Sequence, residues 1–348
     1  MPPPARGSLP LVASGSDRRG FFKELLREAA SVAQELSSAM RAADEPVFDD
    51  WEPPAPVPAK PARGSVDEDS LLSLAREVGL ERRDADLRRL ARASVRLTRG
   101  EPGSSSRLGG SPDVPRGFAW PTADGRELGF LGQLHLEQVA AVDPETPLPR
   151  EGLLLFFYDL AERPPGLLPA DRGSCRVVFL DRRGAELEPD EAHEPVLQAM
   201  PLELSRELML PGAWSFHAES LELSAEEMDA WDELRERLAQ AQGIELEESS
   251  PDRFALHRLF GYQDEIGREV ELDCQLASSG LDADDVSVYY ESRADHETEA
   301  LNWRLLLQLS ADDELGTPRD DEFDRLYVCI RDADLRARNF DAAWAILR

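Results

Sequence analysis

The sequence has no hydrophobic segment that approaches the roughly 20 apolar residues of a membrane-spanning helix. It also has only 3 cysteines in 348 residues, far apart and each among apolar neighbours. This distribution argues against a disulfide framework and against cysteine-ligated metal. We therefore expect Cys175, Cys274 and Cys329 to be buried strand thiols of a cytoplasmic protein.

Basic residues are scarce as well, with 39 Lys and Arg against 69 Asp and Glu, and a formal net charge of −30. Residues 70–348 carry most of the excess, with 31 basic and 57 acidic side chains. Such a body repels phosphate backbones and anionic membranes and attracts basic proteins. We expect no nucleic-acid or membrane binding and a protein partner that is basic, unless the acidity serves solubility alone.

Familiar catalytic motifs are missing: there is no GxSxG elbow, P-loop, dinucleotide fingerprint or HExxH. Acidic runs such as residues 282–285 are typical of solvated faces and helix caps, and the five histidines never pair at ligand spacing. We predict no metal, no cofactor and no catalytic residue. The best acid/base candidate is His257 beside Asp264 or Glu265 on a turn, although a hydrogen-bonded structural histidine is the favoured interpretation.

The N-terminal region begins with the stretch SDRRGFFK (16–23), which is similar to the start of a twin-arginine export signal. Charged residues interrupt the segment that follows, so an export signal is not predicted. Residues 1–43 instead predict a flexible start and an amphipathic helix, and residues 44–65 a proline-rich, acidic, disordered linker. This helix either packs on its own domain or docks on a partner, with an apolar side formed by Phe21, Phe22, Leu25 and Leu26.

Residues 66–348 predict one α+β domain with a helical entry. Helices are expected at Val66–Leu90, Asp84–Ala93, Ala225–Ala241 and around Phe340–Leu347. From Ser94 onward, short apolar segments are separated by Gly, Pro and Asp turns. Strands in series without regularly alternating helices predict mostly antiparallel sheets. The expected strands are SVRLTR, LGFLGQLHL, LLLFFYDL, CRVVFLD, PLELS, SFHAESLEL, EVELDCQL, WRLLLQLS and LYVCIRD.

Two pairs of these segments are alike and predict an internal duplication. FLGQL (130–134) is similar to LLQL (306–309), and GLLLFFYDL is similar to RLYVCIRDADL. The distance from Gln133 to Asp159 is 26 residues, and that from Gln308 to Asp332 is 24. The two glutamines would then occupy related places in two half-sheets, where each either binds a backbone edge or faces a ligand cleft between the halves.

The most distinctive stretch is the loop 106–121, SRLGGSPDVPRGFAWP. Its paired glycines, Gly109 and Gly110, permit unusual backbone angles, while three prolines and Trp120 predict a rigid loop pinned by an aromatic ring. Arg107 stands directly before the glycines. The stretch predicts an ordered loop that leads into the strand beginning near Leu128.

This loop and the strand after it resemble the YwqG-like family, bacterial domains of unknown function (DUF1963). The elements HRLFGYQDEI, WRLLLQ and LYVCIRDADLRARNFDAAWAIL also resemble family motifs, so the likeness spans roughly residues 95–347 in the same order. Gln263 stands where the family usually has Pro, and LGTPRDDEFDR replaces a Trp-Gly-Asp turn. The resemblance implies one cytoplasmic α+β domain without an established reaction, and a role in protein binding or toxin immunity.

Two hypotheses follow. The first is a non-catalytic binding protein whose acidic domain recognises a protein partner, with the N-terminal helix as a docking element. The second is a small-molecule sensor or enzyme with a cleft between the half-sheets, lined by Arg107, Trp120, Gln133, His257 and Gln308. Together they give the candidate binding residues Arg107, Gly109, Gly110, Trp120, Gln133, His257, Asp264 and Gln308.

Overall fold

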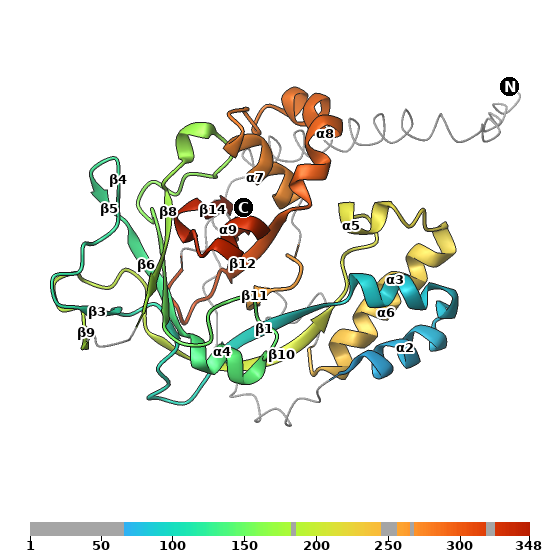
Figure 1. The fold of residues 1–348 in the computed structure, drawn as a ribbon, viewed down its shortest axis with the longest axis horizontal. Helices are drawn as coiled ribbons and strands as arrows, with labels where there is room; N and C mark the ends of the chain where they lie inside the picture. The colour runs from blue at the N-terminus through green and yellow to red at the C-terminus, as the bar shows by residue number, and fades with distance from the viewer. Residues whose placement is uncertain (1–65, 182–185, 245–255, 265–267, 318–323) are drawn as a thin grey trace, which may run out of the picture. The chain divides into compact units, whose positions relative to one another are not determined.

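The computed structural model describes residues 66–181, 186–244, 256–264, 268–317 and 324–348, all within one compact unit of residues 61–348. The predicted N-terminal helix, with Phe21 and Leu25 on its apolar side, and the predicted linker lie outside the described residues. Figure 1 shows the chain coloured from its N-terminus to its C-terminus.

A ten-stranded sheet forms the body, in the order β14-β13-β12-β11-β1-β10-β2-β6-β7-β8, and every described pairing is antiparallel. The predicted α+β class with antiparallel sheets is therefore confirmed. The strands of this sheet are β1 (Arg92–Arg99), β2 (Arg107–Leu108), β6 (Gly129–His135), β7 (Leu153–Tyr158), β8 (Cys175–Leu180), β10 (Met200–Met209), β11 (His257–Phe260), β12 (Trp303–Ser310), β13 (Arg325–Arg331) and β14 (Trp344–Leu347). Two small sheets pair β3 (Asp113–Pro115) with β9 (Leu187–Pro189) and β4 (Thr122–Ala123) with β5 (Arg126–Glu127).

The helices begin where the sequence supplies caps. Asp67 accepts the backbone N–H of Ser70, and Ser224 forms a reciprocal capping box with Glu227, which satisfies N–H groups that a helix start leaves unpaired. The helices are α2 (Glu68–Glu77), α3 (Asp84–Leu90), α4 (Leu136–Val142), α5 (Phe216–Glu219), α6 (Ala225–Ala241), α7 (Val270–Ser278), α8 (Val286–Ala300) and α9 (Asp332–Ala337), with short 3-10 turns η1 (Glu81–Arg83), η2 (Pro169–Asp171) and η4 (Phe340–Ala342).

Several predicted elements are wrong. EVELDCQL forms helix α7 and not a strand, because residues 270–277 are buried on every side and no polar face marks the helical period. SFHAESLEL contains the short helix α5, and the segment 340–347 forms η4 and strand β14 instead of a helix. The second entry helix ends at Leu90, since Ala93 already pairs with β10.

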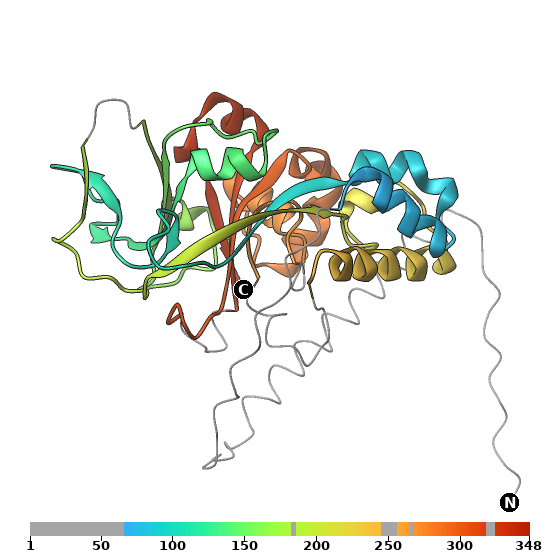
Figure 2. The same ribbon diagram turned by 90° about the horizontal axis from the view of Figure 1, so that it is seen from below.

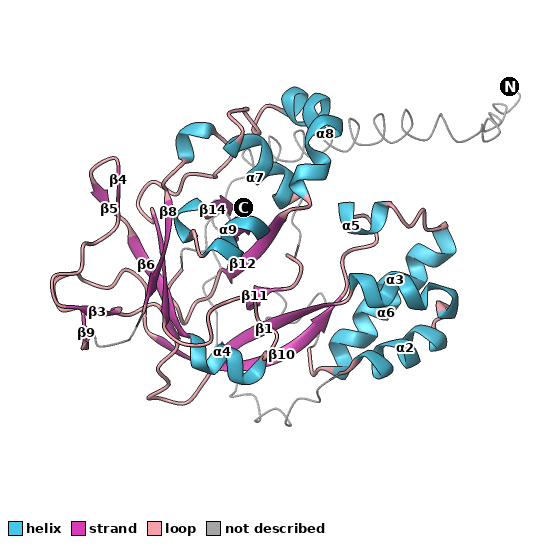
Figure 3. Ribbon diagram, viewed as in Figure 1, coloured by secondary structure: helices cyan, strands magenta, loops and turns pink. Residues whose placement is uncertain are grey.

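Two halves of the sheet face each other across a central core. Buried side chains from both halves meet there, including Phe156 of β7 and Val328 of β13. The outer face of the first half is covered by the chain between β2 and β6, while α7 and α8 cover the outer face of the second half. Figure 3 shows β3, β4, β5 and β9 beside β6 and β8, and α7 and α8 beside β12 and β14.

A helical layer made of α2, α3 and α6 has a core of its own. Trp231 of α6 is fully buried in it, and Leu208 at the end of β10 joins it to the sheet. Figure 2 shows β1 and β10 running from the sheet toward these helices. Helices α2 and α3 lie where the sequence predicts a helical entry, and the chain continues from α3 into β1.

The strand order is symmetric about the central pair β1 and β10. On one side lie β2, β6, β7 and β8, and on the other lie β11, β12, β13 and β14. Each half begins with a long strand that pairs beyond its own half: β1 pairs with β11, and β10 pairs with β2. This strand order agrees with the predicted duplication, as two units that exchange their first strands.

The pairing register repeats in detail. β6 has an irregularity between Phe130 and Gly132, and β12 has one between Leu305 and Leu307, so each precedes its glutamine by one residue. Gln133 is then paired with Leu155 of β7, and Gln308 is paired with Tyr327 of β13. With this register Asp159 is level with Arg331 and not with Asp332, which corrects the predicted alignment by one residue.

Candidate functional site

Gln133 is the centre of a clamp in the first half, together with Arg107 and Asp113. Its side chain is fully buried on β6, opposite Arg107 of β2. The amide oxygen accepts the backbone N–H of Asp113 at 2.8 Å, and the amide nitrogen donates to the Ser105 carbonyl at 3.0 Å and to the Asp113 carboxylate at 2.6 Å. Gln133 therefore binds backbone groups, which is the first of the two predicted roles, and does not face a ligand cleft between the halves.

Arg107 completes this first clamp with a two-pronged ion pair. Its guanidinium donates to both carboxylate oxygens of Asp113, at 2.9 and 3.2 Å, and to the Ser111 carbonyl. Burial alone would raise the pKa of the Asp113 carboxyl, but the hydrogen bonds from Arg107 and Gln133 outweigh it and lower the pKa. The carboxylate stays charged and holds the loop onto the sheet.

The second clamp consists of Gln308, Asp264 and Arg258, and its glutamine repeats the contacts of Gln133 atom for atom. The Gln308 amide oxygen accepts the Asp264 N–H at 2.9 Å, and its nitrogen donates to the Leu256 carbonyl at 3.0 Å and to the Asp264 carboxylate at 2.8 Å. Arg258 pairs with both oxygens of that carboxylate, at 3.2 and 3.1 Å.

A left-handed turn separates the arginine from the aspartate in both clamps. Gly109 and Gly110 have φ of 61° and 69°, and Phe260 and Gly261 have φ of 58° and 74°. A Cβ on Gly109 would lie 2.1 Å from the Gln198 carbonyl oxygen, so only glycine fits there. Each turn leads the chain away from its strand, and each clamp then fixes the start of the segment that covers the outer face.

His257 lies on the opposite side of β11 from Arg258, toward the central core, and not on a turn. Its Nδ1 accepts the Ser310 N–H at 3.2 Å, so Nε2 carries the proton and faces Asp312 at 3.3 Å. The hydrogen bond from His257 lowers the pKa of Asp312 to about 2. The expected partner Asp264 is therefore wrong, and Glu265 lies outside the described residues.

A surface cleft of about 360 Å³ opens beside the first clamp. Its lining includes Gly110 and Trp120 of the predicted loop. The Trp120 ring is stacked on His193, with ring centroids 3.8 Å apart, and its indole N–H donates to the Leu128 carbonyl at 2.9 Å. The predicted pinning of this loop by an aromatic ring is thus confirmed, and the same ring forms a wall of the cleft.

The charged residues that line the cleft with His193 are two exposed glutamates, Glu127 and Glu194. Asp190 holds His193 through the histidine backbone N–H and Nδ1, both at 2.9 Å. The His193 Nε2 atom lies 3.6 Å from Glu127. Val196 adds an apolar edge that is 63% exposed, so the cleft presents carboxylates next to apolar surface.

The candidate residues therefore divide between four places. Arg107, Gly109 and Gln133 belong to the first clamp, and Asp264 and Gln308 to the second. Gly110 and Trp120 line the cleft, and His257 lies on β11 with its side chain toward the central core. The five side chains expected to share a cleft between the halves do not meet, because the central core occupies that space.

Sequence reasoning missed Asp113, Arg258 and His193. A signal for the first two is present: RLGGSPD (107–113) and RLFGYQD (258–264) share Arg-Leu-x-Gly-x-x-Asp. The segment around His193, EAHEPV, carries no comparable pattern. Its place in the cleft follows from β9, which pairs with β3 and brings the next residues over the loop.

Within the described ranges, no helix is long and apolar enough to cross a membrane. The same residues contain no group of three or more His, Cys, Asp or Glu side chains arranged to hold a metal ion. The three cysteines are buried and free; Cys274 lies on helix α7, however, and not on a strand as expected.

A family model described as "Domain of unknown function (DUF1963)" matches residues 106–348, which is more than half of the chain. The match confirms the resemblance seen in the sequence. It begins at Ser106, directly before Arg107 of the first clamp, and it includes the second clamp and the cleft. No curated protein matches the chain.

Proposed function

This chain belongs to the DUF1963 family, and we propose that it is a non-catalytic binding protein whose acidic domain recognises a basic segment of a protein partner at the cleft beside Trp120. The observation that carries the proposal is the lining of this cleft. Glu127 and Glu194 face it together with the exposed side chain of Val196. A Lys or Arg flanked by an apolar residue satisfies both kinds of surface.

Electrostatics favour such a partner over a neutral one. The formal charge of the chain is −30, and a field of one sign accelerates the approach of an oppositely charged protein. Arg107 does not neutralise the cleft, because its guanidinium is held by Asp113 and the Ser111 carbonyl. A bound cation would therefore meet Glu194 and Glu127, of which Glu127 lies 3.6 Å from His193 Nε2.

The surroundings of His257 support a role without catalysis. The side chain is 2% exposed, and both ring nitrogens are engaged, with Ser310 and Asp312. A general base needs access to a substrate proton, which this burial prevents. Three buried free thiols support the cytoplasm as the compartment.

A defined peptide library tests the proposal. We expect the full-length protein to enrich peptides that combine Lys or Arg with an apolar residue, and the E127Q/E194Q variant to lose this enrichment. The matched control E226Q/E236Q makes the same charge change on the exposed face of α6 and should select like the wild type. Equal selection by all three proteins, or enrichment of acidic peptides, would contradict the proposal.

The N-terminal docking helix, with Phe21, Phe22, Leu25 and Leu26, is a separate part of the proposed function. We propose that it contributes a second contact to the same partner, which would be a toxin in an immunity-like role. A protein beginning at Val66 should keep peptide selection at the cleft and lose affinity for the whole partner. Unchanged affinity for the whole partner would remove the helix from the binding function.

A further inference from the structure

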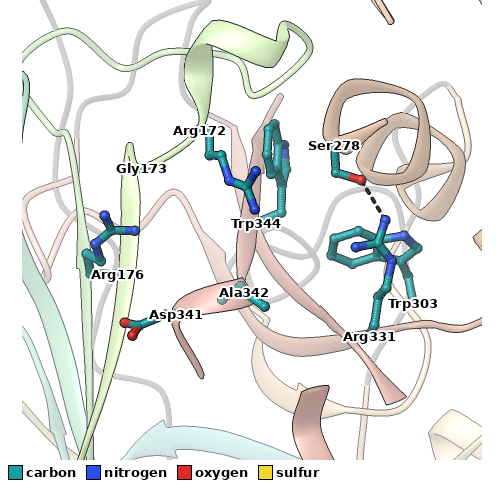
Figure 4. Close-up of a pocket in the computed structure, with 10 residues that line it drawn as sticks. Arg172, Gly173, Arg176, Ser278, Trp303, Arg331, Asp341, Ala342 and Trp344 are labelled. Carbon is teal, nitrogen blue, oxygen red and sulfur yellow. Dashed lines mark hydrogen bonds between the residues drawn. The ribbon is translucent and has the colours of Figure 1, made fainter. Parts of the chain in front are cut away.

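A second, smaller pocket of about 40 Å³ lies where the two edges of the sheet approach each other. The first half contributes Arg172, Gly173 and Arg176, and the second half contributes Arg331 and Trp344 among others. Figure 4 draws Arg172 and Arg176 on one side and Arg331 with Trp303 on the other. The pocket thus joins two segments that are far apart in the sequence.

These two segments occupy equivalent positions in the duplicated fold. When β8 and β14 are aligned through their pairings with β7 and β13, residues 172–176 stand at the register of residues 340–344. Contacts between the edges close the gap on one side: the Leu347 N–H donates to the Pro165 carbonyl at 3.1 Å, and the Trp344 indole N–H donates to the Gly166 carbonyl at 2.7 Å. Interfaces between structural units are common positions for ligand sites.

Arginines are clustered at this pocket, although the chain as a whole is acidic. Three guanidinium groups line one small pocket in a protein with 69 acidic and 39 basic side chains. Arg331 is fixed in place: it donates to Ser278 at 2.8 Å and to Gln275 at 3.1 Å, and it stacks on the Trp303 ring at 4.4 Å. None of these three partners neutralises its positive charge.

Arg172 and Arg176 differ from most arginines of the described residues, because no carboxylate pairs with them there. The Arg176 guanidinium folds back toward Gly173, where a Cβ would lie 3.6 Å from its nearest nitrogen. Asp341 is the one carboxylate among the lining residues; it is exposed, and its single charge does not balance three arginines. The pocket keeps a net positive charge at the surface of an acidic protein.

We propose that this pocket binds a tetrahedral oxyanion, either inorganic phosphate or the phosphate group of a small phosphomonoester. Guanidinium forks match the oxygen spacing of phosphate and remain charged at every physiological pH. A single water needs about 10–15 Å³ of such space, so 40 Å³ suits one group of four oxygens, and any substituent on a phosphomonoester would extend outside the pocket. The acidic exterior repels polyanions, which restricts the site to small anions.

Titration calorimetry of the full-length protein with inorganic phosphate, at constant ionic strength with chloride as the balancing anion, tests the site. We expect saturable binding with one phosphate per chain. The R172Q/R176Q variant should bind at least tenfold more weakly. Both side chains are partly or fully exposed and carry no hydrogen bond in the described structure, so the variant should melt like the wild type. The matched control R82Q/R116Q removes two exposed arginines elsewhere and should bind phosphate unchanged.

A second arm distinguishes the two sources of the anion. Phenyl phosphate binding more tightly than inorganic phosphate would assign the site to a phosphomonoester, and weaker or equal binding would assign it to the free anion. The E127Q/E194Q variant should bind phosphate like the wild type, because the cleft is a different site. Absence of saturable phosphate binding, or equal affinity of the wild type and R172Q/R176Q, would overturn the proposal.

Discussion

The two clamps share the glutamine hydrogen bonds and the arginine–aspartate pair, but their surroundings differ. In the first, the Arg107 side chain is 18% exposed and its loop borders the open cleft. In the second, Arg258 is 3% exposed, and the Asp264 carbonyl also accepts the Tyr327 hydroxyl and an Arg325 guanidinium N–H. Helices α7 and α8 cover the second copy of the repeat, whereas the first copy borders an open cleft.

This difference distinguishes a structural role that both copies of the repeat share from a binding role proposed for the first copy alone. Both clamps attach a covering segment to the outer face of a half-sheet, so both are structural. The first cover, between β2 and β6, borders a cleft of about 360 Å³. We therefore expect substitutions in the second clamp to change stability most, and substitutions at the cleft to change binding most.

The largest effect is expected from Arg258→Met. Removing this buried guanidinium leaves the carboxylates of Asp264 and Glu207 without it, and Glu207 is itself only 4% exposed. Breaking a buried ion pair from one side costs about 3–5 kcal/mol. Arg107→Met should cost about 1–2 kcal/mol, because its carboxylate partner Asp113 is 23% exposed, whereas Arg258 also faces the buried Glu207. Urea unfolding followed by circular dichroism measures both changes.

The exposed Arg116→Met is the control for this pair and should change the free energy of unfolding by less than about 0.5 kcal/mol. A loss in Arg107→Met as large as that in Arg258→Met would show that the two clamps are equally closed. The contrast between the halves would then fail.

The glutamines should behave alike, in contrast to the arginines. Gln133→Leu and Gln308→Leu each leave a backbone N–H and a carbonyl without their buried partner, which costs about 1–3 kcal/mol. Both side chains are 0% exposed, so the two losses should agree within about 1 kcal/mol. Urea unfolding of the two variants tests this, and a negligible loss in Gln133→Leu alone would show that the first clamp is dispensable for folding.

The equivalence of these clamps was only partly predictable from the sequence. The apolar strands around Gln133 and Gln308 indicated a duplication, but the shared Arg-Leu-x-Gly-x-x-Asp pattern before them was the stronger signal and was overlooked. It escaped because the second copy has Phe260 where the first has Gly109, and Phe at positive φ is rare. Two local sequences thus reach one backbone geometry.

Elements with a polar and an apolar side were predicted well, and elements buried on all sides were not. Helix α6 has acidic residues opposite its buried stripe and was found with its bounds. Helix α7 is buried throughout residues 270–277, and only its tertiary position distinguishes it from a strand. The cleft was unpredictable for a similar reason: His193 reaches Trp120 through a pairing between β3 and β9, which lie more than 70 residues apart.

Acid unfolding tests the pair formed by His257 and Asp312, which lies next to the second clamp. Ser106 and His257 hold equivalent places, accepting the backbone N–H of His135 and of Ser310, but only His257 has a carboxylate partner. The hydrogen bond from His257 lowers the pKa of Asp312 to about 2 from an ordinary 3.8. A lowered pKa contributes stability above pH 4 that is lost as the pH falls through 2, here about 2 kcal/mol.

The variant Asp312→Asn should therefore be less stable than the wild type at pH 5–7 by up to about 2 kcal/mol, and the difference should shrink toward zero near pH 2. Urea unfolding at several pH values measures it. Asp229→Asn on the exposed face of α6 serves as the control and should follow the wild type throughout. A difference that does not depend on pH would contradict this contribution of the Asp312 charge.

The smallest change in stability is expected from His193→Ala, at the cleft. The ring stacks on Trp120 from the solvent side, and such a pair contributes about 1 kcal/mol. Trp120 keeps its hydrogen bond to the Leu128 carbonyl and its contact with Phe157, so the loop should stay pinned. Peptide selection should nevertheless weaken, because one wall of the cleft is gone. Thermal unfolding and peptide binding measured on the same sample separate the two roles. A loss of stability as large as that of Gln133→Leu would instead place His193 in the structural cover, and the first half would then be as closed as the second.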